Sequence, residues 1–166
     1  MTTAPPRTQL LRWQDPTPLR ETFQREGGLV MLSGIVDGLL PPAPMTELLG
    51  FKLVEVEAGR TVWIADPDEQ HHNEVGLVHG GLAAGLLDTA LGTTVVSALP
   101  AGTRCASLNL HVDFLRPLVP GGGRVRCEGR IVRLGSRIVV ADAELSDAAG
   151  EALARASSTV SIVRAT

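Results

Sequence analysis

The first part of the chain has the apolar spacing of helices. Residues 17–25 are compatible with a short helix, and Gly27-Gly28 ends it. A second, amphipathic helix is predicted by four apolar residues at helical spacing, Leu29, Leu32, Val36 and Leu39. The proline-rich run that begins at Pro41 ends this helix. We interpret the pair as a cap over one edge of the core, while a lid over a pocket stays open as the alternative.

The rest of the chain alternates between apolar and polar residues, which is typical of strands. Residues 51–57 and 61–65 form a predicted hairpin around Ala58-Gly59. Four further strands are predicted later in the chain, over residues 107–114, 124–131, 137–146 and 153–163. Glycine-containing turns separate these strands, so they follow one another as an antiparallel meander.

One long helix is predicted between the hairpin and the four later strands. Residues 82–99 read LAAGLLDTALGTTVVSAL and contain a single charged residue, Asp88. A helix that is apolar all round belongs in an interior, and an antiparallel sheet needs a cover for its apolar face. The order of elements therefore predicts an α+β fold in which this helix packs on the sheet.

Asp88 is expected to be buried with its helix. An unpaired carboxylate in an apolar interior is costly unless it is hydrogen-bonded or protonated. Two interpretations remain open at this point. The carboxylate of Asp88 either accepts hydrogen bonds from neighbouring backbone or hydroxyl groups, or it is desolvated and serves as a base or nucleophile.

The start of the long helix carries a second candidate feature. His79-Gly80-Gly81 stands there, preceded by Asn73 and Gly76. Two glycines at a helix N-terminus let a ligand approach bare backbone N–H groups, where the helix dipole is positive. This arrangement can hold a developing oxyanion, although an ordinary turn into a helix would use the same residues. Asn73 and His79 could orient the loop or bind a water.

The spacing of these residues limits how they can act together. Asp88 follows His79 by nine residues, which is about 13.5 Å along a helix and about 180° around it. One chain therefore cannot bring its own Gly80 amide and its own Asp88 to the same carbonyl group. If both act on one substrate they come from different subunits, which predicts a homodimer with shared sites.

Composition excludes several classes of protein. The chain has 166 residues, 44% hydrophobic and 20% charged, which fits one folded domain with a short extension. The net charge of −3 and the lack of a basic run argue against a nucleic-acid or membrane-surface partner. No signal peptide or membrane span is apparent, so we expect a cytoplasmic protein. Cys105 and Cys127 have no metal-ligand spacing and are expected to be reduced core residues.

Other motifs favour no competing chemistry. His71, His72 and His79 match no zinc-binding spacing, and no metal is expected. The run Gly121–Gly123 follows a proline and lacks the Lys-Ser/Thr of a P-loop. No GxSxG elbow is present, which argues against an α/β-hydrolase.

Two segments together resemble a known family. The motif HNxxGxxHGG at residues 72–81, with Asp88 nine residues after His79, is similar to the signature of hotdog-fold acyl-CoA thioesterases of the PaaI-like, phenylacetate-degradation type. The run SLNLHVDFLRP at residues 107–117 is similar to the strand that follows in that family. The resemblance covers Leu48 to Val163. Asn109 departs from it, since an acidic residue is frequent at that position.

The resemblance implies a fold and an assembly. It implies a hotdog domain over residues 47–166, in which the sheet wraps the central helix, after an N-terminal helical extension over residues 1–46. It also implies a homodimer, often doubled to a dimer of dimers. The expected reaction is hydrolysis of an acyl-CoA to a free acid and coenzyme A, with no cofactor beyond the coenzyme A of the substrate.

The resemblance also implies roles for individual residues. The Gly80 N–H matches the donor to the thioester oxyanion, and Asp88 of the partner subunit matches the general base or nucleophile. Asn73, His79 and Ser107 match positions that place the substrate or the attacking water. Coenzyme A contacts are expected from a further set of residues, Gly81, Arg116, Gly135, Ser136, Arg137 and Ser158.

Two alternative functions remain. A non-catalytic acyl-CoA-binding protein could keep the fold, but it would not need the carboxylate of Asp88 within an apolar helix. A hotdog hydratase or dehydratase pairs a loop histidine with a helix carboxylate in a different motif, which this sequence lacks.

Overall fold

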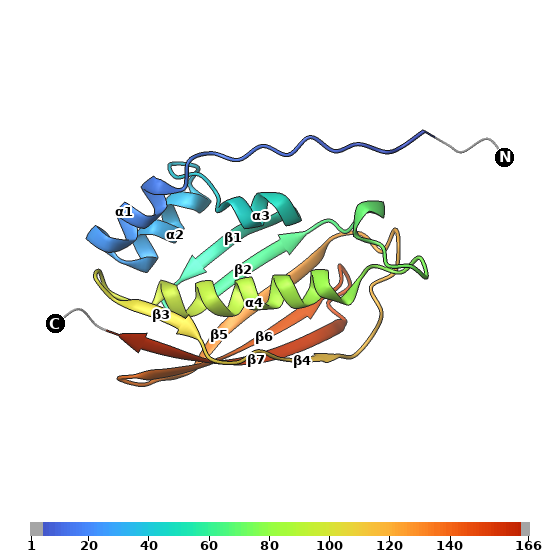
Figure 1. The fold of residues 1–166 in the computed structure, drawn as a ribbon. Coiled ribbons are helices and arrows are strands. Elements are labelled where there is room, and N and C mark those ends of the chain that lie inside the picture. The colour runs from blue at the N-terminus through green and yellow to red at the C-terminus, as the bar shows by residue number, and fades with distance from the viewer. Residues whose placement is uncertain (1–4, 164–166) are drawn as a thin grey trace.

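A computed structural model describes residues 5–163 and shows one antiparallel sheet curved around a long helix (Figure 1). The sheet contains seven strands: β1 (Phe51–Glu57), β2 (Arg60–Ala65), β3 (Arg104–Ser107), β4 (His111–Phe114), β5 (Val125–Leu134), β6 (Ile138–Ser146) and β7 (Ala152–Val163). The helices are α1 (Thr17–Glu26), α2 (Gly28–Val36), α3 (Pro44–Leu49) and α4 (Gly80–Ser97), with a 3-10 turn η1 (Glu69–His71). The strand order is β1-β2-β5-β6-β7, and both β3 and β4 pair with β7. The predicted α+β architecture is confirmed, but the predicted meander of the four later strands is wrong for the first of them, since β3 and β4 lie beside β7 and not beside β5. The domain boundary at residues 46 and 47 stays a prediction.

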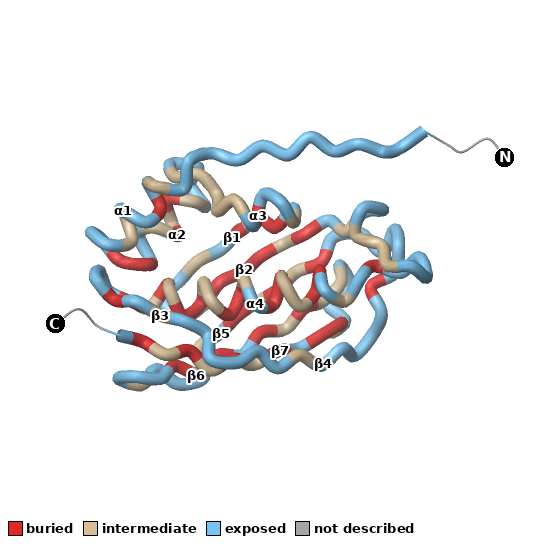
Figure 2. Tube along the Cα trace, in the orientation of Figure 1, coloured by how far each residue is buried: buried red, intermediate tan, exposed pale blue. Residues whose placement is uncertain are grey.

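The core lies between α4 and the inner face of the sheet. The buried residues gather along α4 and on alternate positions of the strands that face it (Figure 2). Among the fully buried side chains of this core are Leu86, Leu87, Leu91 and Val95 of α4 and Cys127, Val139, Leu145 and Val160 of the sheet. In β5 the period of two identifies the inner face correctly at Val125 and Cys127, whereas the apolar residues Leu108, Leu110 and Phe114 of the preceding alternating segment are exposed.

Gly129 in β5 lets the helix approach the sheet closely. A Cβ atom at this position would lie 2.3 Å from Thr94 Oγ1 and 3.0 Å from the carbonyl oxygen of Ala90, both in α4. The Thr94 hydroxyl also lies 2.7 Å from the hydroxyl of Thr61 in β2. Helix and sheet are therefore joined by a hydroxyl pair at a point where no side chain fits between them.

The prediction of one strand over residues 107–114 is wrong. The structure has two short strands, β3 and β4, and the segment between them is one residue longer than the facing part of β7. The extra residue forms a bulge, in which the side chain of Asn109 accepts the N–H of Thr159 at 2.9 Å. The hydroxyl of Ser158 donates to the carbonyl oxygen of Asn109 at 2.8 Å. Because a shift of one residue exchanges the two faces of a strand, a single alternation cannot describe this segment.

The N-terminal helices differ from the prediction at their ends. Helix α2 stops at Val36 rather than continuing to Leu39, and Gly38 follows with a positive φ of 72°. Helix α3 was not predicted. Pro44 occupies its first turn, where a proline fits a helix well, although the sequence pattern treated this proline only as a helix breaker.

Helix α2 is held against the C-terminal end of α4. The N–H of Gly28 donates to the carbonyl oxygen of Leu99 at 3.0 Å. A Cβ atom on Gly28 would lie 1.7 Å from the carbonyl oxygen of Val96, so only glycine fits there. Leu32 is buried in the same core as α4 and the sheet, as the interpretation of a cap expects.

Within residues 5–163 none of the helices has both the length and the apolar character that crossing a membrane requires.

We expect Gly129→Ala to destabilise the protein by about 1–3 kcal/mol, because the added methyl group overlaps Thr94 and the backbone of α4. Urea unfolding measures the change in the free energy of unfolding. The matched control is Gly92→Ala in α4, where a Cβ atom meets nothing within 4 Å. That substitution should stabilise the helix by roughly 0.5–1 kcal/mol. Equal effects of the two substitutions would contradict the close approach at Gly129.

Candidate active site

His79 caps the N-terminus of α4. Its Nδ1 atom accepts the backbone N–H of Gly81 at 2.7 Å, and its own backbone is extended. A Cβ atom on Gly81 would lie 2.8 Å from this Nδ1 atom, so the cap requires glycine at position 81. The His79 side chain and the Gly81 N–H are thus engaged with each other in the structure.

The N–H of Gly80 is the unengaged donor at this helix end. Among residues 5–163 it donates to no protein acceptor, and it lies at the first position of α4, where the helix dipole is positive. A Cβ atom at Gly80 would lie 3.3 Å from the ring of Phe114 in β4. The glycine therefore leaves space between the helix end and this ring.

Asn73 organises the loop that leads into α4. Its side-chain oxygen accepts the backbone N–H groups of Val75 and Leu77, both at 3.0 Å. The N–H of His79 donates to the carbonyl oxygen of His71 at 2.7 Å, which closes the loop at its far end. Asn73 and His79 both orient the loop, which is one of the two roles that the sequence left open for them.

Asp88 is exposed in the single chain, so the expectation that its helix buries it is wrong. It lies on the face of α4 that the sheet does not cover. The other residues of this face are small or weakly polar, namely Gly85, Thr89, Gly92 and Thr93. This exposed face was not recognised from the sequence because α4 has no other charged residue. Glycine and threonine, which make up most of the face, are neither charged nor strongly apolar.

A cavity of about 890 Å³ lies over this face of α4. Helix α4 contributes Asp88, Thr89, Gly92 and Thr93. The sheet and the N-terminal extension supply apolar walls, which include Phe51, Leu53, Trp63, Met31, Leu32, Ile35, Val36 and Leu39. The extension is therefore both a cap on the core and a wall of this cavity. The sequence interpretation favoured the cap and gave a lid over a pocket as the alternative; the structure shows the cap and, in place of a lid, a wall of the cavity.

Gly80 lies outside this cavity. It precedes Asp88 by eight residues, which is about 12 Å along the helix axis. Within one chain the free N–H and the carboxylate are thus separated, as their spacing in the sequence indicates. Ser107 is also outside the cavity, exposed at the end of the edge strand β3.

The residues expected to contact coenzyme A do not come together in one chain. The backbone of Arg116 bonds to Leu153 near the start of β7, and that of Arg137 bonds to Ile162 near its end. Nine residues of strand separate these two points, which is about 30 Å. Gly135, Ser136 and Arg137 line a small cavity of about 270 Å³ at one end of the sheet, and Arg116 lines another of about 260 Å³ at the opposite end.

The side chains of two of these residues are already engaged. Arg116 forms an exposed ion pair with Glu151 at 2.8 Å. Ser158 is buried, and its hydroxyl donates to the bulge at Asn109. In the single chain, the Ser158 hydroxyl is therefore part of the sheet edge rather than of an open phosphate site.

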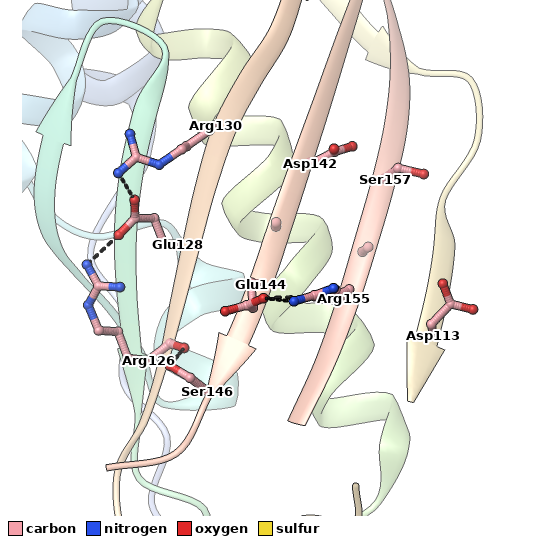
Figure 3. Close-up of a pocket in the computed structure, with 11 residues that line it drawn as sticks. Asp113, Arg126, Glu128, Arg130, Asp142, Glu144, Ser146, Arg155 and Ser157 are labelled. Carbon is pink, nitrogen blue, oxygen red and sulfur yellow. Dashed lines mark hydrogen bonds and ion pairs between the residues drawn. The ribbon is translucent and has the colours of Figure 1, made fainter. Parts of the chain in front are cut away.

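A charged groove of about 610 Å³ crosses the outer face of the sheet (Figure 3). Glu128 in β5 lies along one side of the groove and accepts hydrogen bonds from Arg60 and Arg126, while Arg130 forms an ion pair with it. Burial favours the neutral form of Glu128, but the hydrogen bonds from Arg60 and Arg126 outweigh it and lower the pKa to about 2. Since these charges neutralise one another, we assign them to the stability of the sheet.

The two cysteines take no part in a reactive site. Cys127 is fully buried, and burial raises the pKa of its thiol to about 12. Burial also raises the pKa of the Cys105 thiol. Both are free thiols, and the high pKa values keep them protonated. Among residues 5–163, no three His, Cys, Asp or Glu side chains come together in the way that a metal site needs.

Sequence reasoning missed the residues that form the walls of the Asp88 cavity. Trp63 donates its indole N–H to the hydroxyl of Thr93 at 2.9 Å, which fixes the ring beside the exposed face of α4. One sequence signal for the position of the cavity was available, namely the repeat of small and polar residues at positions 85, 88, 89, 92 and 93 of α4. That spacing marks one continuous helix face.

Comparison with known proteins gives consistent matches. The sequence profile of the Thioesterase superfamily matches residues 75–154. A "putative esterase" of Halobacterium salinarum is 44% identical over 69 residues, which span 40% of this chain and 44% of that protein. A "putative esterase" of Pseudomonas aeruginosa is 30% identical over 123 residues, which span 74% of this chain and 90% of that protein.

A solved structure is similar in both fold and sequence. It is the crystal structure of a "putative thioesterase, phenylacetic acid degradation-related protein" from Ralstonia eutropha. The TM-score is 0.71 at 30% sequence identity, and the match covers 78% of this chain and 98% of that one.

We expect Glu128→Gln to lower the free energy of unfolding by roughly 2–3 kcal/mol at pH 7, because the pKa of Glu128 is about 2 in the folded chain and about 4.3 in an unfolded one. A lowered pKa stabilises the fold above the unfolded value. The difference from wild type should therefore shrink between about pH 4.5 and pH 2. Unfolding measured across this pH range tests it.

The control is Glu144→Gln, which removes an exposed ion pair with Arg155 and should cost less than about 1 kcal/mol. A pH-independent effect of Glu128→Gln would contradict the assignment.

Proposed function

This chain belongs to the thioesterase superfamily, and we propose that it is an acyl-CoA thioesterase that releases a free acid and coenzyme A. The observation that carries the proposal is the carboxylate of Asp88 beside a large, mainly apolar cavity. An acyl group has the apolar character that these walls favour. The hydrolysis of a thioester follows from the family, while coenzyme A as the leaving group is our inference.

The Gly80 N–H is proposed as the donor that stabilises the oxyanion. It has no protein acceptor within residues 5–163, and the positive end of the α4 dipole reinforces it. The His79 cap and the Asn73 loop hold this helix end in place. Because the donor is fixed before the substrate arrives, little reorganisation accompanies the build-up of negative charge.

Asp88 is proposed as the general base or the nucleophile. As a base it accepts a proton from a water molecule, whose oxygen attacks the thioester carbonyl while coenzyme A departs as its thiolate. As a nucleophile it attacks the carbonyl directly, and water then hydrolyses the resulting anhydride. Both routes yield the same acid, and both need the carboxylate near a carbonyl held by an N–H.

A homodimer is proposed because one chain separates these two groups by about 12 Å. The edge formed by β3 and β4 lies beside Gly80 through Phe114 and carries exposed Leu108, Leu110 and Phe114. Pairing of this edge with a second copy would cover these side chains, and the Asp88 of that copy would complete the site. Ser107 ends β3 on the same edge and is proposed to contact the attacking water.

Coenzyme A would lie across the assembly. The roughly 30 Å between Arg116 and Arg137 in one chain means that they could serve one coenzyme A only from different subunits. We keep Arg137 and the preceding Gly135-Ser136 turn as candidates for the phosphates, since guanidinium groups bind phosphate in a forked geometry. A dimer of dimers and a cytoplasmic location are proposed as well, the latter in keeping with two free thiols.

We expect Asp88→Asn to lower the rate of thiol release from acyl-CoA by about 10²–10⁴-fold, because the amide can neither accept the proton nor attack. A thiol reagent monitors coenzyme A release from a panel of acyl-CoA esters. Unchanged release by Asp88→Asn would remove Asp88 from the mechanism. Binding of acyl-CoA by wild type without release from any ester would favour the non-catalytic binding protein.

We expect Gly80→Pro to lower the turnover rate by about 10²–10³-fold, because proline deletes the N–H proposed as oxyanion donor. Proline is tolerated at the first position of a helix, and the extended backbone of His79 suits a residue before proline. The matched variant is Gly80→Ala, which adds the same Cβ beside Phe114 but keeps the N–H. Equal losses in the two variants would contradict the role of the N–H.

Mixed dimers of the Asp88→Asn and Gly80→Pro chains extend this test to the shared site. Each mixed dimer keeps one intact site if the two groups come from different subunits, and random mixing should restore about a quarter of wild-type activity. If both groups act within one chain, every site carries one defect and the mixture stays inactive.

A further inference from the structure

We propose that α2 and the loop that follows it form the wall of the acyl-binding site, and that Gly92 sets the depth of that site. The substrates would then be thioesters of large apolar acids without polar substituents. This inference rests on the proposed function, because it takes Asp88 as the reacting end of the cavity.

Gly92 extends the cavity away from Asp88. It lies four residues further along α4, which is one helical turn on the same face. A Cβ atom at this position would meet nothing within 4 Å, so the missing side chain leaves open space inside the cavity. An acyl chain whose carbonyl lies at Asp88 would pass over Gly92.

The part of the wall next to Asp88 and Gly92 offers little beyond apolar contact, although Gln14, Glu47 and Lys52 also line the cavity. Trp63 uses its N–H on the hydroxyl of Thr93, and that hydroxyl donates in turn to the carbonyl oxygen of Thr89. The hydroxyl of Thr89 donates to the carbonyl oxygen of Gly85. A hydroxyl or carboxyl group on the acyl chain beside Trp63, Thr89 and Thr93 would lose its hydration without finding a free partner among these three side chains. The walls therefore favour plain alkyl or aryl groups.

Two contacts hold α2 in place as a wall of the cavity. Gly28 fixes the start of α2 against the end of α4, and Leu32 is buried in the core one turn later. Met31 and Ile35 of the same helix line the cavity. Because α2 is held by a contact that only glycine permits, the wall has a defined position.

The size of the cavity favours a large acyl group. Its volume of about 890 Å³ lies toward the upper end of the range of roughly 300–1,000 Å³ in which small-molecule sites fall. An acetyl group would leave most of the apolar wall in contact with water. A longer alkyl chain would bury that surface and gain the corresponding hydrophobic free energy.

Gly92→Leu tests the depth of the site. Its side chain would occupy the space over which the acyl chain passes, while leucine also favours the helix. We expect kcat/KM for octanoyl-CoA to fall by about tenfold or more relative to wild type. The value for acetyl-CoA, which does not reach Gly92, should change by less than about twofold. Thermal unfolding of both proteins verifies that the variant is folded.

Ile35→Ala provides the opposite change. It removes side-chain volume from the α2 wall, so the ratio of kcat/KM for dodecanoyl-CoA to that for octanoyl-CoA should rise about threefold or more relative to wild type. This variant leaves α4 unchanged, and it keeps the proposal testable if Gly92→Leu does not fold.

The outcomes separate the two proposals. Absence of hydrolysis of every ester by wild type would overturn the proposed function. Hydrolysis by wild type with equal losses for acetyl-CoA and octanoyl-CoA in Gly92→Leu would overturn the acyl site and leave the thioesterase intact. An unchanged chain-length ratio in Ile35→Ala would overturn the role of α2. Opposite shifts in the two variants would support the whole inference.

Discussion

The close contact between α4 and the sheet is the constraint on which the other features depend. Gly129 admits the helix backbone, and the hydroxyl pair of Thr61 and Thr94 fixes its rotation about its own axis. With one side of α4 turned to the sheet, the side that carries Asp88 and Gly92 must face elsewhere. The N-terminal helices cover part of that side without filling it, and the cavity is what remains.

The elements with a strong period were predictable from the sequence, and those fixed by a single contact were not. The long apolar helix and the strands β1, β2, β5, β6 and β7 follow from spacing alone. The bulge at Asn109 depends on a hydrogen bond to a strand about 50 residues away, which no local pattern reveals. The exposure of Asp88 likewise depends on which side of α4 the sheet occupies.

The glycine pair at the start of α4 combines two requirements that the sequence could not separate. Gly81 is needed because the imidazole of His79 occupies the place of a side chain, whereas Gly80 borders the ring of Phe114 and keeps a free N–H. The motif could be located from the sequence, but assigning a purpose to each glycine needed the contacts. Arg116 and Arg137 illustrate the same limit. The sequence places both near the end of a strand, but it does not show that they lie at opposite ends of the sheet.

The two edges of the sheet differ in a way that limits how copies of the chain can associate. Helices α2 and α3 pack against β1, while the edge made by β3 and β4 has no strand beyond it within residues 5–163. An uncovered strand edge is a template on which chains can stack without end. In this sheet the bulge at Asn109 interrupts the uncovered edge. Each copy of the chain has only one such edge, so pairing of two copies through it would leave no uncovered edge for a third copy. The fold thereby favours a closed complex over a growing fibre.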